Sequence, residues 1–142
     1  MVRRFRLVAA VMFVEAASLA VASAAHLSGH VTGRSAPFDG DHAGIAEAII
    51  GAVLAASAVA MLRLPRRARV IGLLANGFAA AGFLVGLRAT ALGGHWPDIA
   101  YHLIVLPVLV GSLVVLARAS GNRGSRPTAP PAPPGSPAIP AR

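Results

Sequence analysis

The stretch "AGIAEAIIGAVLAASAVAMLRL", residues 43–64, decides the fold because Glu47 and Arg63 are its only charged residues. A helix needs about 20 residues to cross the ~30 Å hydrocarbon layer of a membrane, and this stretch is long enough. No water inside a bilayer satisfies the backbone polar groups, so such a stretch has to be helical there. The sequence therefore predicts a transmembrane helix in this region.

Three more apolar runs of similar length occupy most of the remaining chain. They are residues 5–27, 70–87 and 99–117. Apart from Arg6 at the start of the first run, Glu15 is the one charged residue inside them. Of the 142 residues, 56% are apolar and 13% are charged, which is too apolar for a soluble domain of this size. We expect an all-α polytopic membrane protein, a four-helix transmembrane bundle over residues 1–118, with helices at about 5–27, 42–64, 69–90 and 97–118.

The segment 119–142 differs in composition from the rest of the chain. It holds seven of the eleven prolines and has no apolar periodicity, so we expect a disordered, Pro-rich tail. The chain has no cysteine, which excludes disulfides and thiol redox chemistry.

The positions of the arginines predict the orientation. Eleven of the 13 basic residues, all arginine, lie before the first apolar run, between the second and third, or after the fourth. By the positive-inside rule both termini are cytoplasmic in a multi-pass plasma-membrane protein. Because the arginines flank membrane segments, we expect them to contact lipid headgroups and not nucleic acid. Any protein partner would be a second copy of the chain or another membrane protein.

An alternative interpretation applies to the N-terminus. Residues 1–24 have a basic start, an apolar middle and an Ala-Ser-Ala triplet at 22–24, as in a cleaved signal peptide. Glu15 interrupts the apolar middle, which is also longer than usual in a signal peptide, and both features favour a retained helix. Cleavage would leave three transmembrane helices.

With this orientation, all five histidines and four of the five acidic residues lie at or near the outer surface. Histidine and carboxylate side chains together suit zinc, copper, nickel or iron. Candidate metal ligands are therefore His26, His30, His42, Glu47, Asp98 and His102. A b-type haem held by His26 and His102 is the related possibility, since four-helix bundles bind haem between facing helices. The competing interpretation is that these side chains only hydrogen-bond to each other, to water and to headgroups.

Glu15 is the acidic residue that lies elsewhere. It is nine residues beyond Arg6 and so about 13 Å into the layer, where an isolated charged carboxylate is costly. We expect Glu15 to be neutral or paired, and the candidate partners at comparable depth are Asn76, Ser57 and Ser112. Two roles are open for Glu15 and Asn76: a hydrogen bond that joins two helices, or proton or substrate handling in transport.

Three stretches, "IAEAIIGAVLAASAVA" at 45–60, "GFAAAGFLVGL" at 77–87 and "PDIAYHLIVLPVL" at 97–109, give the chain a resemblance to the small four-helix integral membrane proteins of actinobacteria. That resemblance implies the four helices and no particular activity. A looser similarity is to the small multidrug resistance transporters, which place one glutamate in their first helix as "VEAASL" does at 14–19. The chain lacks the aromatic-rich second and third helices of those transporters, and it adds the tail and the histidines.

These observations favour a non-enzymatic membrane protein, because the serines have no evident base and no catalytic set is present. We expect its outer polar layer to be structural, or to hold a metal or haem as an accessory to a membrane complex. A small proton- or cation-coupled transporter that uses Glu15 is the alternative.

Overall fold

The structure is a computed structural model that describes residues 2–119, and all regular secondary structure in this range is α-helical. Each helix begins one to three residues before the expected boundary, and α3 ends three residues later than expected. The predicted tail lies outside the described residues apart from Ala119. The helices are α1 (Val2–Leu27), α2 (Gly40–Arg63), α3 (Ala68–Gly93) and α4 (Trp96–Arg118).

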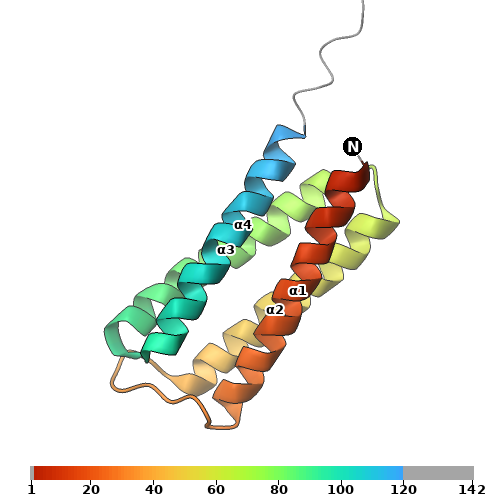
Figure 1. Cartoon of the computed structure of the whole chain (residues 1–142). Helices are drawn as coiled ribbons and strands as arrows, with labels where there is room; N and C mark the ends of the chain where they lie inside the picture. The colour runs from red at the N-terminus through yellow and green to blue at the C-terminus, as the bar shows by residue number, and fades with distance from the viewer. Residues whose placement is uncertain (1, 120–142) are drawn as a thin grey trace, which may run out of the picture.

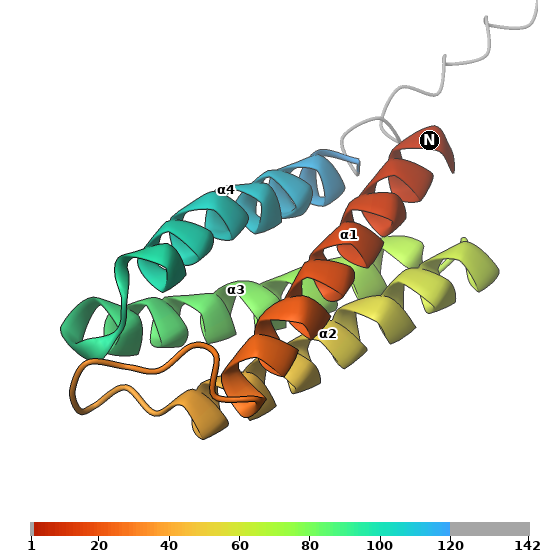
Figure 2. The ribbon, with the colours of Figure 1, turned by 60° about the horizontal axis from the view of Figure 1, so that its bottom comes forward.

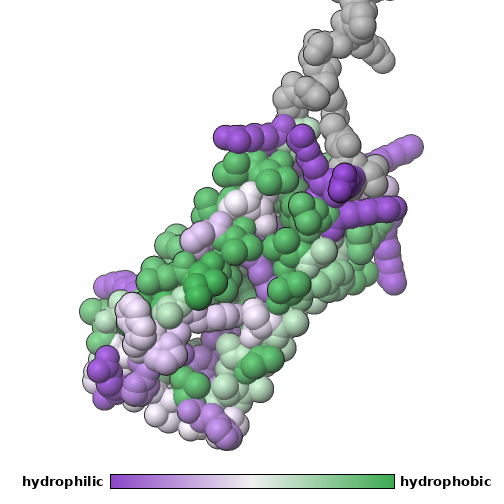
Figure 3. Space-filling view, in the orientation of Figure 1, coloured by the Kyte–Doolittle hydropathy of each residue, from purple (hydrophilic) through white to green (hydrophobic). Residues whose placement is uncertain are grey.

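All four helices are long and apolar enough to cross a membrane. Large apolar side chains point away from the protein on every helix, such as Val14, Val85 and Ile104, which are 71%, 73% and 68% exposed. Figure 3 shows the resulting apolar surface between two more polar ends. A surface of this kind would be unfavourable in water, so the four helices indicate a multi-pass membrane protein.

The helices form two antiparallel hairpins that pack against each other. α1 packs along α2, α3 packs along α4, and α2 joins the hairpins by packing on α3. In Figure 1, α1 and α4 lie in front of α2 and α3, and Figure 2 shows the same arrangement from a second direction. α1 and α4 touch each other at few points, so this side of the molecule is less tightly closed than the others.

The core forms because each helix directs one face inward. On α1 the buried residues recur at three- or four-residue intervals, the spacing that places side chains on one side of a helix. The buried residues of this core include Val8, Met12, Ala16 and Leu19 of α1, Ile50, Leu54, Ala58 and Met61 of α2, Ala75, Ala79 and Phe83 of α3, and Val105, Leu109 and Leu116 of α4.

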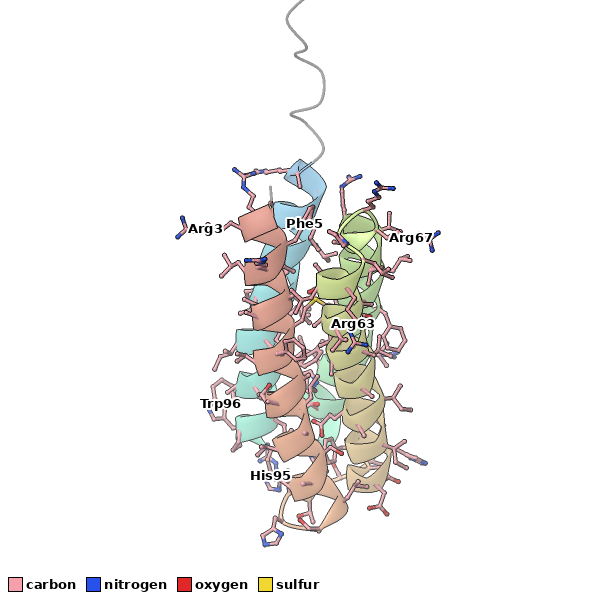
Figure 4. The ribbon with its side chains drawn as sticks, turned by 90° about the vertical axis from the view of Figure 1, so that its right-hand side faces the viewer. Arg3, Phe5, Arg63, Arg67, His95 and Trp96 are labelled. Atoms are coloured by element: carbon pink, nitrogen blue, oxygen red, sulfur yellow. The ribbon has the colours of Figure 1, made fainter. Side chains whose placement is uncertain are left out.

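The two ends of the molecule differ in charge. At the arginine end lie the start of α1, the α2–α3 turn and the last turn of α4, and at the opposite histidine end lie the α1–α2 loop and the α3–α4 connection. Figure 4 shows Arg3 and Arg67 toward the first end and His95 and Trp96 toward the second. Arg69 Nε donates to the Leu116 carbonyl over 3.0 Å, so a cation satisfies the C-terminal turn of α4.

Candidate functional site

Three helices bring one histidine and two carboxyl groups together at the histidine end. The Nδ1 of His26, in the last turn of α1, lies 2.7 Å from Glu47 Oε2 of α2. Its Nε2 lies 3.6 Å from Asp98 Oδ1, in the first turn of α4. The exposed fractions of His26, Glu47 and Asp98 are 5%, 8% and 9%. We call these three residues the acid–histidine cluster.

The close approach of α1 and α2 places His26 beside Glu47. A Cβ on Gly44 would lie 2.8 Å from Leu27 Cγ and 3.2 Å from His26 Cβ, so glycine is needed where the two helices meet. Ser23 Oγ also donates a 2.7 Å hydrogen bond to the Gly44 carbonyl. These contacts hold the end of α1 against the start of α2.

The side chain of Asp39 caps the N-terminus of α2, close to this contact. It accepts hydrogen bonds from the backbone N–H groups of His42, over 3.1 Å, and Asp41, over 3.0 Å, as an N-cap does. The hydrogen bond from His42, followed by the nearby His42 ring and the Asp41 N–H, lowers the pKa of the Asp39 carboxyl from its ordinary value. The cap therefore favours the ionised form.

The α1–α2 loop crosses the histidine end and is tied to α3. The backbone N–H groups of Arg34 and Ser35 donate to the Gly93 carbonyl over 2.7 and 3.2 Å. A Cβ on Gly93 would overlap the Ser35 carbonyl oxygen, so this contact requires glycine. The same loop sets the Phe38 ring 5.8 Å from the ring of His26, which covers the cluster from that end.

Two buried polar atoms of the cluster are left without a hydrogen-bond partner among residues 2–119. They are His26 Nε2 and Asp98 Oδ2. An unsatisfied buried donor or acceptor costs about 1–3 kcal/mol, and native proteins leave few of them. His26 Nε2 lies nearest to the other carboxyl oxygen of Asp98, Oδ1, at 3.6 Å.

The three residues of the acid–histidine cluster line a cavity of about 490 Å³ between α2 and α3. Most of its lining is apolar, and the acid–histidine cluster supplies polar groups on one side. Phe78 and Val85 of α3, which also line it, are 48% and 73% exposed on the lipid-facing surface of the helix. The cavity therefore connects the cluster with the side of the molecule that faces the hydrocarbon.

The six predicted metal ligands are only partly brought together. His26, Glu47 and Asp98 form the cluster, and His42 and His102 line the same cavity. His42 is exposed, with its Nδ1 3.3 Å from Asp39 Oδ2. His102 Nδ1–H donates to the Asp98 carbonyl over 2.8 Å.

His30 lies apart from the other five. α1 ends at Leu27, so His30 lies in the loop that follows, and its ring bonds to Ser28 Oγ over 2.8 Å. Within the described part of the chain, no group of three or more histidine, aspartate and glutamate side chains is arranged to hold a metal ion. The metal site stays a prediction.

Glu15 lies in a second cavity of about 490 Å³, between α1 and α4. The side chain is 5% exposed, and neither carboxyl oxygen has a hydrogen-bond partner among the described residues. The expected bond to Asn76 is not formed: Asn76 Nδ2 donates to the Gly72 carbonyl of its own helix over 2.8 Å, and Asn76 Oδ1 has no partner among the described residues. Ser18 and Tyr101, which hydrogen-bond to each other over 2.9 Å, bridge α1 and α4 beside Glu15.

Sequence reasoning did not find the parts of the site that depend on helix packing. Phe83 lies 5.1 Å from the ring of His102 and 5.8 Å from that of Tyr101, centroid to centroid, and Phe38 covers His26. The Ser18–Tyr101 bond joins residues 83 positions apart. No local pattern marks such pairs.

No protein-family model, curated protein or solved structure matches the chain.

Proposed function

We propose that the protein is a non-enzymatic, multi-pass plasma-membrane protein that binds a small amphipathic molecule in the cavity between α2 and α3. The polar end of this molecule lies against the acid–histidine cluster, and its apolar part fills the remaining cavity. With the arginine end in the cytoplasm, the bound molecule lies at the level of the outer leaflet.

The observation that carries this proposal is the group of three buried polar residues, His26, Glu47 and Asp98, at one side of a mostly apolar cavity. A volume of about 490 Å³ is within the range of about 300–1,000 Å³ typical of small-molecule sites. Such sites combine a mostly apolar lining with a few converging polar groups, as here. Opening toward the hydrocarbon gives entry from the membrane.

Blocking the cavity tests the proposal. Ala46 lines it, whereas Ala48 lies on the same helix, is exposed and does not line it. We expect an amphipathic molecule to co-purify in stoichiometric amount with the wild type and with Ala48→Trp, and to be lost from Ala46→Trp. Mass spectrometry of the detergent-purified proteins measures this. Equal co-purification with both variants would refute the proposal.

A metal or haem remains the alternative occupant of the same cluster. His26 Nε2 and Asp98 would be adjacent metal donors, and a b-type haem would take the imidazoles of His26 and His102. Zinc, copper or haemin that binds the wild type and His30→Leu but not His26→Leu would favour this alternative. Unchanged elemental content and visible spectrum after their addition would exclude it.

A second candidate function belongs to Glu15. Neither oxygen of this buried carboxyl has a hydrogen-bond partner within residues 2–119, and its cavity faces the hydrocarbon between α1 and α4, the least tightly packed side of the bundle. We propose that Glu15 exchanges a proton for a cation there, as a small coupled transporter would require. Charging the carboxyl is costly without a cation beside it, so uptake of one would release the other.

Proton release separates this role from helix packing. The wild type in weakly buffered detergent should release a proton when tetraphenylphosphonium is added, and Glu15→Gln should not. Ser18→Ala, which alters the neighbouring bridge and keeps the carboxyl, should still release it. A Glu15→Gln protein that is only less stable, with no proton release from the wild type, would assign Glu15 to packing.

A further inference from the structure

We infer that the molecule bound between α2 and α3 is an amphipathic primary amine, which presents a protonated amino group to the acid–histidine cluster. This inference rests on the proposed function and adds the chemical class of the ligand. Two observations carry it. The cluster has more carboxyl groups than imidazoles, and the polar atoms that keep accessible surface at the cavity are hydrogen-bond acceptors.

The acid–histidine cluster holds two carboxyl groups and one imidazole. With both carboxyls ionised and the ring of His26 neutral, the cluster carries two negative charges, and one added proton leaves one negative charge wherever that proton resides. This count does not depend on the tautomer of His26. An uncompensated charge is costly in a buried site. A ligand with one positive charge neutralises the cluster that has taken up a single proton.

The other titratable residues at the cavity do not compensate this charge. Among residues 2–119 they are Asp39, His42 and His102, and no arginine lines the cavity. His42 is exposed, and its Nδ1 lies 3.3 Å from Asp39 Oδ2, so a charge on its ring pairs with Asp39. The ring of His102 packs against Phe83, and its Nδ1–H donates to an uncharged carbonyl, so no carboxylate bonds to it.

Three atoms of residues that line the cavity are available to a ligand. Glu47 bonds to His26 through Oε2, which leaves Oε1. His102 bonds to the Asp98 carbonyl through Nδ1, which leaves Nε2 as an acceptor in the neutral ring. Asp98 Oδ1 makes no hydrogen bond, since its nearest partner is 3.6 Å away. None of the three is among the buried atoms without a partner, so each keeps accessible surface.

A protonated primary amine matches these groups better than other head groups do. It carries one positive charge and three N–H donors, and it has no acceptor. A hydroxyl or a neutral carboxyl group is uncharged and donates one hydrogen bond, and a quaternary ammonium is charged but donates none. A carboxylate would add a negative charge beside two acidic residues. Hydrogen bonds between oppositely charged groups are also stronger than those between neutral groups.

The apolar lining of the cavity fits the remainder of an amphipathic amine. Leu19, Ile50, Phe78 and Phe83 line this part of the cavity. A hydrocarbon chain attached to the amino group fills the space between them and reaches the lipid past Phe78, which is 48% exposed. A small inorganic cation would neutralise the cluster but leave most of the cavity of about 490 Å³ unfilled.

Probes that share one hydrocarbon chain and differ in the head group test the inference. Purified full-length protein in nanodiscs of phosphatidylcholine, which has no net charge, is loaded at neutral pH with tritiated tetradecylamine. Unlabelled tetradecylamine, tetradecyltrimethylammonium, 1-tetradecanol and tetradecanoic acid compete for it, and empty nanodiscs correct for partition into lipid. Because hydrogen bonds to charged groups contribute more than neutral ones, we expect the amine to compete on the order of tenfold better than each of the others.

Two variants replace an acidic residue by its neutral amide. Asp98→Asn removes a negative charge and an acceptor at the cavity, so it should abolish the preference for the amine over the alcohol. Asp41→Asn makes the same change at an exposed residue of α2 that does not line the cavity, and it should behave as the wild type does. If Asp98→Asn does not fold, the probe series on the wild type still decides.

The outcomes separate the inference from the proposed function. Equal or better competition by any other probe, or an unchanged preference in Asp98→Asn, would overturn the amine and leave the proposed function standing. Saturable binding of the labelled amine that persists in Ala46→Trp would overturn the proposed function itself. No saturable binding of the labelled amine, with no molecule co-purifying with the wild type, would do the same.

Discussion

His26 has a carboxyl group on each side of its ring. We therefore expect substitution of this one residue to lower the free energy of unfolding strongly. His26→Leu leaves Glu47 and Asp98 buried without the group between them, and breaking a buried pair in this way costs about 3–5 kcal/mol. The double variant His26→Leu/Glu47→Leu should be less destabilised than the single one, because no unpaired Glu47 remains. Reversible unfolding by SDS in mixed micelles measures both.

The same substitution at an exposed histidine is the control. His30 makes one hydrogen bond, to Ser28, in an exposed part of the loop, so His30→Leu should change the stability by less than about 0.5 kcal/mol. Equal destabilisation by His26→Leu and His30→Leu would mean that the cluster contributes nothing specific.

The ionisation of Asp39, the N-cap of α2, should make the stability of the protein depend on pH. Hydrogen bonds from the backbone, first from His42, lower the pKa of this carboxyl in the folded protein. A depressed pKa stabilises the fold at pH values above the ordinary aspartate pKa, and this contribution is lost as the pH falls through the folded value. We expect the difference in Tm between the wild type and Asp39→Asn to be constant above about pH 5 and to shrink below about pH 4. Thermal melts across this range test it. A difference in Tm that grows as the pH falls would contradict this prediction.

At the level of the helix, the apolar runs predicted where α1 to α4 lie but not how they end. The requirement for about 20 apolar residues acts locally, so each span was recognisable from its own residues. The loop after α1 depends instead on contacts with another helix, since the backbone N–H groups of Arg34 and Ser35 bond to the Gly93 carbonyl of α3. Long-range contacts of this kind leave no local pattern.

Alanine substitutions at two glycines of α3 should have opposite effects on stability. A Cβ at Gly72 would lie 2.8 Å from Leu116 Cδ1 and 3.0 Å from Met61 Sδ, two side chains with 1% and 2% exposure. Gly72→Ala should therefore destabilise the protein by about 1–3 kcal/mol, as overpacking does. At Gly77 a Cβ would meet nothing within 4 Å, so Gly77→Ala should be neutral or stabilise by up to about 1 kcal/mol. Equal effects in SDS unfolding would show that α3 is not held between α2 and α4 at Gly72.

For the whole molecule, the distribution of charge and hydropathy along the sequence predicted the arrangement of the helices and their ends. The types of polar side chain did not predict which of them meet in the acid–histidine cluster. Arg3 and Arg67 lie toward one end of the fold and His95 toward the other, as the separation of most arginines from the histidines along the chain indicated (Figure 4). The acid–histidine cluster needs α1, α2 and α4 to meet, and the sequence indicated only that their polar residues lie at similar depths. It did not indicate that His26 and Asp98 would share a cavity while His30 lies outside it.

We expect the arginine end to face the cytoplasm and the histidine end to face outward. Because the chain has no cysteine, single introduced cysteines can test this orientation. Ser28→Cys places a thiol in the loop at the histidine end, and Leu64→Cys places one at the arginine end, where Leu64 is 48% exposed. Neither change removes an arginine. With the arginine end in the cytoplasm, a membrane-impermeant maleimide should label Ser28→Cys in intact cells and Leu64→Cys only after permeabilisation.

The reverse labelling would move the cavity between α2 and α3 to the cytoplasmic leaflet. The proposed binding site consists only of the cluster and its cavity, so it would stand, and the leaflet that supplies the ligand would change. Labelling of both thiols in intact cells would instead indicate a mixed orientation. That result would contradict the positive-inside assignment, because the charge difference between the two ends would then fail to orient the chain.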